Sequence, residues 1–226
     1  AFVIVAGNGQ SVSTTQRAPV APVVQVTDGN FGVAGITVTF TVTGGDGTVT
    51  PSTGVTDADG RASTVWRMGP DAGANAITAA ATGLPAVTLG ATAVPLVISA
   101  FTAVDGDNAV AFVNNFADRL PRVEVRDQLN APVEGATVTF AVQGGGGSVP
   151  FSSVATDLDG RATPGAWRFG AAGPQSLGAS VAGGAPVTFS GNATTAPPGA
   201  YNIDLRFLTP LPTADPETPS ATTQRA

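Results

Sequence analysis

Two acidic turns hold the residues whose types and spacing could do chemistry in this chain. Asp57 and Asp59, and again Asp157 and Asp159, are followed at once by a glycine. Closely spaced carboxylates before a glycine could begin a calcium loop, because hard cations bind several oxygen ligands. The later ligands of an EF-hand loop are missing, and the same residues suit a hairpin turn in which aspartate accepts backbone hydrogen bonds and glycine adopts a positive φ. We therefore favour turns, predict no metal, and keep the four aspartates as the candidates if calcium binds.

Other residue types that carry chemistry are absent. The chain has no cysteine and no histidine, which excludes disulfides and thiol nucleophiles and removes the commonest general base and metal ligand. All 10 basic residues are arginine, so lysine Schiff bases and Ser–Lys dyads are excluded as well. We predict that the chain is not an enzyme and uses no cofactor.

Charge and hydropathy exclude further classes of partner. The net charge of −6 argues against nucleic-acid binding, which needs clustered Lys or Arg, and against docking on anionic lipid. No apolar run approaches the roughly 20 residues that a membrane-spanning helix needs. We predict no nucleic-acid partner and no membrane insertion.

The acidic turns lie within a sequence that occurs twice. Residues 37–45 (TVTFTVTGG) return as residues 137–145 (TVTFAVQGG), and residues 56–62 (TDADGRA) return as residues 156–162 (TDLDGRA). The copies lie about 100 positions apart, which is the length of one immunoglobulin-like sandwich. Around Phe40 and Phe140, apolar residues alternate mainly with threonine, which predicts strands with one buried face.

The repeat defines the expected domains. We predict an all-β chain with two tandem immunoglobulin-like β-sandwiches, residues 1–94 and 95–196, and a C-terminal extended strand and tail, residues 197–226. Each module has roughly seven strand candidates separated by Gly, Asp and Asn turns, without helical periodicity. The join at residues 93–96 (AVPL) is short and restricts domain motion, so we expect a fairly stiff rod.

Aromatic side chains separate shared from unshared positions. Trp66 and Trp167 are equivalent in the two copies, so we predict that they fill the two cores. Phe112, Phe116 and Leu120 belong to the second copy alone. They are therefore our candidates for a domain contact or an assembly surface, although core packing is the interpretation that we favour.

The C-terminal segment has a pattern of its own. Tyr201, Ile203, Leu205 and Phe207 alternate with polar residues, which predicts an amphipathic strand before a proline-rich stretch. Such a strand could be the first strand of a further domain. It could also pair with the open sheet edge of a neighbouring subunit, and we take it as the candidate assembly strand.

Both modules resemble the group 1 bacterial immunoglobulin-like family, the repeated stalk domains of invasin- and intimin-like surface proteins. Residues 33–40 and 56–62 match best, and the resemblance covers nearly all of residues 1–195. It implies extracellular spacers or adhesive units of the bacterial surface that carry no catalytic residues.

We therefore expect a non-enzymatic, extracellular structural protein. Its tandem rod would form a bacterial surface stalk or fibre, associating with itself or with neighbouring domains of a larger surface protein, and assembled by strand donation through residues 201–208. Two alternatives stay open: an adhesin that binds a ligand through loops at one sandwich end, and the accessory stalk of a secreted protease whose catalytic domain lies outside this chain.

Overall fold

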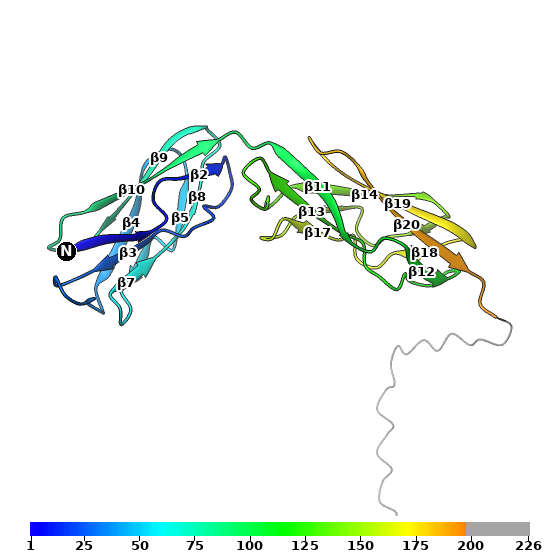
Figure 1. The fold of residues 1–226 in the computed structure, drawn as a ribbon, viewed down its shortest axis with the longest axis horizontal. Helices are drawn as coiled ribbons and strands as arrows, with labels where there is room; N and C mark the ends of the chain where they lie inside the picture. Colours follow the sequence, from blue (N-terminus) through cyan, green and yellow to red (C-terminus); the bar gives the residue numbers. More distant parts are fainter. Residues whose placement is uncertain (198–226) are drawn as a thin grey trace, which may run out of the picture. The chain divides into compact units, whose positions relative to one another are not determined.

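The computed structural model describes residues 1–197, and these residues contain strands and no helix. The predicted assembly strand at Tyr201, Ile203, Leu205 and Phe207 lies outside the described residues. Ala1–Thr195 form one compact unit. The prediction of an all-β fold with two sandwiches is confirmed (Figure 1). The described part contains no helix with the length and hydrophobicity needed to span a bilayer.

Each sandwich has ten assigned strands. In the first sandwich these are β1 (Phe2–Ala6), β2 (Gln10–Ser13), β3 (Val23–Val26), β4 (Thr37–Gly44), β5 (Thr48–Thr50), β6 (Thr53–Val55), β7 (Arg61–Ser63), β8 (Val65–Arg67), β9 (Gly73–Ala80) and β10 (Val87–Val94). In the second they are β11 (Ile98–Asp105), β12 (Ala109–Phe112), β13 (Arg122–Asp127), β14 (Thr137–Gly144), β15 (Gly147–Ser148), β16 (Ser153–Ala155), β17 (Arg161–Ala162), β18 (Arg168–Phe169), β19 (Gly173–Val181) and β20 (Val187–Thr194). The number exceeds the expected seven because turns divide the chain into short segments that pair separately, such as β5 with β8.

The sheet order is the same in both sandwiches. The first has sheets β1-β3-β7 and β2-β10-β9-β4-β6 with the ladder β5-β8, and the second has β11-β13-β17 and β12-β20-β19-β14-β16 with β15-β18 (Figure 1). Neighbouring strands are antiparallel except for the edge pairs β2·β10 and β12·β20. In these parallel pairs Ser13 lies opposite Val94 and Phe112 lies opposite Thr194. The ends of β2 and β12 therefore lie beside the last strand of their sandwich, where the chain leaves it.

The repeated strands β4 and β14 follow the alternation in the sequence. Val38 and Phe40 are buried while the flanking threonines are exposed, and Val138 and Phe140 repeat the pattern. A strand directs successive side chains to opposite faces, so this period of two places one face in the core. The prediction for these strands is confirmed.

Each sandwich has its own hydrophobic core. One gathers residues from Val12 to Ala93 and the other gathers residues from Phe101 to Ala193. Trp66 and Trp167 are both 0% exposed, which confirms the predicted core role. Their indole N–H groups have no hydrogen-bond partner within the described residues. Burial of the rings must therefore outweigh the cost of leaving these donors unpaired.

Candidate functional site

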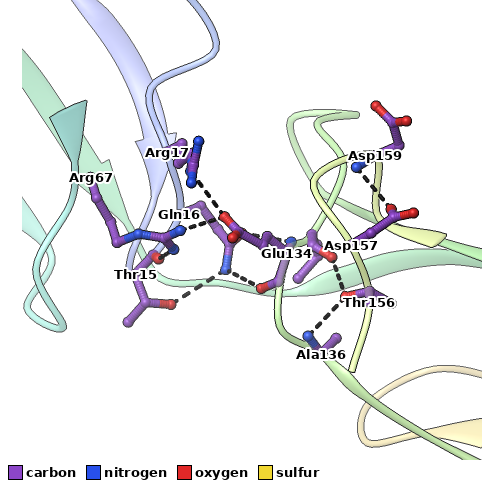
Figure 2. A network of polar contacts seen from close by, with 10 residues as sticks. Thr15, Gln16, Arg17, Arg67, Glu134, Ala136, Thr156, Asp157 and Asp159 are labelled. Carbon is purple, nitrogen blue, oxygen red and sulfur yellow. Dashed lines mark hydrogen bonds and ion pairs between the residues drawn. The ribbon is translucent and has the colours of Figure 1, made fainter. Parts of the chain in front are cut away.

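Polar side chains of both sandwiches meet at the joint between them. The first sandwich contributes the β2 end, which we define as residues 13–17 together with Arg67 of β8. The second contributes the β13–β14 loop, residues 127–134. Figure 2 shows part of this network, with Glu134 meeting Gln16, Arg17 and Arg67.

Asp127 forms the buried part of the joint. Its Oδ1 accepts the backbone N–H groups of Leu129 at 2.9 Å and Ala131 at 2.8 Å. Its Oδ2 accepts the Ser13 hydroxyl of the other sandwich at 2.7 Å. Asp127 and Ser13 are each only 1% exposed. A carboxylate buried this far needs its hydrogen bonds, so the Ser13 contact ties the loop of the second sandwich to the first.

Glu134 forms the outer part of the joint. Its backbone N–H donates to Gln16 Oε1 at 2.9 Å, and Gln16 Nε2 donates back to the Glu134 carbonyl at 3.3 Å. Its carboxylate pairs with Arg17 Nε at 3.1 Å and with the Arg67 guanidinium. Arg67 also donates to the Thr15 carbonyl at 2.7 Å, which fixes the orientation of its planar group. One carboxylate thus joins two arginines that come from separate segments of the first sandwich.

The linker between the sandwiches is fixed to both sides. Gln128 Nε2 donates to the Pro95 carbonyl at 2.9 Å and to Ser13 Oγ at 3.1 Å. Gln128 Oε1 accepts the Val97 N–H at 3.0 Å. The N–H of Leu96 donates to Thr14 Oγ1 at 3.2 Å. The linker therefore forms hydrogen bonds with both sandwiches.

The sequence analysis missed this joint. Its members are Ser13, Gln16, Arg17, Arg67, Asp127, Gln128 and Glu134. One signal was present in the sequence, because Glu134 stands where the first copy has Ala34. The contacts of the joint could not be read from the sequence, since Ser13 and Asp127 are separated by 114 positions.

The four aspartates of the acidic turns form backbone turns in the structure. Asp57 Oδ1 accepts the N–H groups of Asp59 and Arg61, both at 2.9 Å. Asp157 Oδ1 does the same with Asp159 at 2.9 Å and with Arg161 at 2.8 Å. The following glycines have φ of 73° in both copies. Within residues 1–197 no group of three or more His, Cys, Asp or Glu side chains is placed to hold a metal ion.

The predicted contact residues lie on the surface of the second sandwich. Phe112 is 44% exposed, Phe116 is 53% exposed and Leu120 is 46% exposed. The core packing that we favoured for them is therefore wrong. These side chains are attached to β12 and the segment after it, whose inward positions are taken by smaller residues such as Ala109. Their role as a contact surface stays a prediction.

Glu124 of β13 forms a separate ionic cluster in the second sandwich. Its side chain is 11% exposed and lies between Arg126 and Arg161, with Arg161 Nε at 3.2 Å. Burial opposes ionisation of this carboxyl, but hydrogen bonds from Arg126 and Arg161 outweigh it and lower the pKa of Glu124. The cluster is internal to the second sandwich, where Arg126 also donates to the Asn130 carbonyl of the β13–β14 loop at 2.8 Å.

Comparisons with known proteins found neighbours among solved structures. No protein-family model matches the chain, and no curated protein matches it. The D0–D1 domains of intimin are similar at 17% identity and a TM-score of 0.37, over 84% of this chain and 97% of that one. Invasin, a bacterial integrin-binding protein, is similar at 21% identity and a TM-score of 0.41, over 87% of this chain and 39% of invasin.

The adhesin InvE of Yersinia pseudotuberculosis is similar at 17% identity and a TM-score of 0.38, over 86% of this chain and 59% of InvE. This chain therefore spans less than two thirds of the invasin and InvE chains that it matches. These neighbours include domains of intimin and invasin, the surface proteins whose stalk domains the sequence resembles. The assignment to the group 1 bacterial immunoglobulin-like family stays a prediction.

Proposed function

We propose that this protein is a non-enzymatic structural unit of a bacterial surface stalk or fibre. Its two modules, residues 1–94 and 95–196, act as a stiff spacer outside the cell. The observation that carries the proposal is the joint, in which Asp127 and Glu134 of one sandwich bind side chains of the other. The repeated acidic turns at Asp57 and Asp157 form hydrogen bonds within their own sandwich, so the polar groups that connect the two sandwiches are those of the joint.

The joint supports a spacer because its contacts come from several segments. Asp127 and Gln128 bind the β2 end and the linker, while Glu134 reaches Arg67 on β8. Rotation about the linker would have to break a buried charge-assisted hydrogen bond together with the ion pairs. Leaving a buried charge without its partner is costly, so the arrangement in which the joint is formed should dominate in solution.

The stiffness of the joint can be tested by NMR. Residual dipolar couplings from the two sandwiches should fit a single alignment tensor in the wild type. Glu134→Ala, combined with Ser13→Ala, should give two different tensors while both sandwiches stay folded. Asp59→Ala is the matched control, since Asp59 is exposed in the acidic turn of the first sandwich. Independent tensors in the wild type would refute the stiff spacer.

The location can be tested on intact cells of the source organism. Antibodies raised against the folded chain should label cells without permeabilisation, and external protease should remove the signal. Labelling that needs permeabilisation would refute an extracellular role. The control is an antibody against a cytoplasmic protein of the same cells.

Assembly by strand donation through residues 201–208 is part of the proposal. The supporting observation is the alternation of Tyr201, Ile203, Leu205 and Phe207 in the sequence. Deleting residues 201–208 should abolish any fibre seen by electron microscopy. Unchanged fibres would refute strand donation.

A second candidate function is a ligand-binding adhesin. It requires an aromatic anchor at a loop tip, and both tryptophans are buried. Phe31, in the loop after β3, is 75% exposed and could serve instead. A glycan and host-protein array probed with the wild type and with Phe31→Ala tests this, and signals that Phe31→Ala does not reduce would refute the anchor.

A further inference from the structure

The second sandwich has a surface equivalent to the β2 end of the first. We define the β12 end as Phe112, Asn115, Phe116 and Arg168. Ser13 lies opposite Val94 in the first sandwich just as Phe112 lies opposite Thr194 in the second. The segments continue in step, because the N–H of Ala18 donates to the Trp66 carbonyl at 2.7 Å and that of Ala117 donates to the Trp167 carbonyl at 2.8 Å.

Two further features confirm this alignment. Thr15 has φ of 64° and its counterpart Asn114 has φ of 63°, a conformation that is uncommon for residues other than glycine. The side chain of Arg67 donates to the Thr15 carbonyl and that of Arg168 donates to the Asn114 carbonyl. Ser13 therefore corresponds to Phe112, Arg17 to Phe116, and Arg67 to Arg168.

The equivalent ends differ in what covers them. At the β2 end the second sandwich covers the surface, and Ser13 and Gln16 are 1% and 6% exposed. At the β12 end Phe112 and Phe116 are 44% and 53% exposed. Two phenylalanines on one exposed end are an apolar patch in a position that serves as a docking surface one repeat earlier.

The first sandwich has a loop equivalent to the one that docks at the joint. The β3–β4 loop, residues 28–34, corresponds to the β13–β14 loop, residues 127–134. The N–H of Val33 donates to the Val26 carbonyl as the N–H of Val133 donates to the Val125 carbonyl. The next residue in each loop is Ala34 in the first sandwich and Glu134 in the second.

One ion pair of the joint has two apolar counterparts. Arg17 and Glu134 form an ion pair at the joint, while their counterparts are Phe116 in the β12 end and Ala34 in the β3–β4 loop. The β3–β4 loop also holds Phe31, which is 75% exposed and corresponds to Ala131. At these positions the β12 end and the β3–β4 loop are therefore both more apolar than the joint.

Two charges of the joint are retained. Arg168 corresponds to Arg67, and Asp28 corresponds to Asp127, because the N–H of Asp28 donates to the Phe31 carbonyl as that of Asp127 donates to the Ala131 carbonyl. Hydrogen bonds from the N–H groups of Phe31 and Asn30 lower the pKa of Asp28, so it is anionic at neutral pH. The β3–β4 loop therefore carries an anion and an exposed phenylalanine, and the β12 end carries a cation and two phenylalanines.

We propose that the β12 end of one copy binds the β3–β4 loop of a second copy, head to tail. Phe112 and Phe116 would pack on Phe31 and Ala34, and the opposite charges of Arg168 and Asp28 would favour this orientation. Such an interface uses a different patch on each partner, so it is heterologous and can extend into open chains rather than closed dimers. No linker raises the effective concentration here, and the patch is small, so the association should be weak and dependent on concentration.

The test uses the full 226-residue chain in sedimentation velocity over a wide concentration range, with NMR shift changes to map contacts. Phe116→Arg installs the arginine of the β2 end where the facing loop has Ala34 and no glutamate, and should weaken association by at least about tenfold. Phe31→Ala should do the same from the other side. Phe151→Ala is the matched control, because Phe151 is also an exposed phenylalanine, at 60%. It lies outside the β12 end, since the carbonyl of the next residue, Ser152, accepts the N–H of Phe140 in the middle of β14.

A mixing experiment tests the head-to-tail arrangement directly. The Phe31→Ala variant keeps an intact β12 end and the Phe116→Arg variant keeps an intact loop. Each alone should stay monomeric, whereas an equimolar mixture should form dimers that grow no further. Mixtures that stay monomeric would overturn the proposal.

Two other outcomes would also overturn it. One is association of the wild type that none of these substitutions changes. The other is association that deletion of residues 201–208 abolishes while the phenylalanine substitutions leave it intact, since strand donation would then be responsible. The proposal does not depend on where the protein is displayed, so it can fail or succeed separately from the cell-labelling experiment.

Discussion

The two sandwiches have the same strand order but fill the space beside their tryptophans differently. In the second sandwich the Trp167 and Phe169 rings meet edge to face, with centroids 4.7 Å apart. In the first sandwich the position of Phe169 is held by Met68, which is also buried. The larger Phe169 is accommodated because Gly191 stands where the first sandwich has Ala91. The fold therefore tolerates a change in the volume of one core residue when a neighbouring residue changes in the opposite direction.

The two sandwiches also differ in their charges. Asp107 and Glu124 of the second sandwich both have lowered pKa values, and their counterparts in the first are Asn8 and Gln25. Each sandwich therefore supplies the control residue for the other. Exchanging residues between equivalent positions shows which of these differences changes the free energy of unfolding.

The largest effect should come from the tryptophans. Trp66→Ala and Trp167→Ala should each destabilise their own sandwich by about 3–5 kcal/mol, because a buried ring is lost and a cavity remains. Trp167→Ala should cost more, since the contact with Phe169 contributes about 0.5–1.5 kcal/mol. Urea unfolding monitored by circular dichroism gives both free energies of unfolding. The fluorescence of the remaining tryptophan reports the unfolding of the unchanged sandwich. Equal losses would contradict a contribution from the ring pair.

The next effect concerns the compensating pair at positions 169 and 191. A Cβ at Gly191 would lie 2.5 Å from Phe169 Cζ, so Gly191→Ala should cost about 1–3 kcal/mol through overpacking. In a Phe169→Met background the same change should cost at least about 1 kcal/mol less, because the pair then matches the first sandwich. A double-mutant cycle in urea measures the coupling. Additive costs would show that the two positions do not compensate each other.

Glu124→Gln should have a smaller effect at neutral pH. Losing its hydrogen bonds to Arg126 and Arg161 should destabilise the second sandwich by about 1–2 kcal/mol. Since the folded pKa of Glu124 is lowered, its stabilising contribution is present above the ordinary pKa of about 4.3 and disappears as the pH falls through the folded value. The wild type should therefore lose more stability than Glu124→Gln between pH 7 and pH 3, measured by urea unfolding. Parallel pH profiles would contradict this.

Asp107→Asn should have the smallest effect. Asp107 Oδ1 accepts the N–H and hydroxyl of Ser190 at 2.8 Å and 2.7 Å, and these bonds lower its pKa. Asn8 accepts the Gly90 N–H at 2.8 Å at the same place in the first sandwich, so asparagine should fit and cost less than about 1 kcal/mol at pH 7. The stabilisation by Asp107 should be lost as the pH falls below about 4, and Asp107→Asn should remove that loss. Thermal unfolding at pH 7 and pH 3 measures both, with Asp118→Asn as the surface control.

The fold could be predicted from the sequence because the patterns that specify strands and turns are local and occur in both copies. Val38 and Phe40 show the strand period directly, and the turn at Asp57 depends on hydrogen bonds within a few residues. The prediction failed for Phe112 and Phe116, which are apolar and yet exposed. Hydrophobicity favours burial on average, but the side of the strand that a residue occupies depends on register, which neighbouring strands set.

By itself the sequence determined the strands, the turns, the two cores and the absence of cysteine, histidine and lysine chemistry. Only the tertiary structure decided where function should be sought. It brought Ser13 to Asp127 and Arg67 to Glu134, pairs whose members are far apart in the chain. It also showed that Phe112 and Phe116 occupy the place of that joint one repeat later. The physical reason is that periodicity records which face of a strand is buried, whereas a contact between domains depends on which ends meet in space.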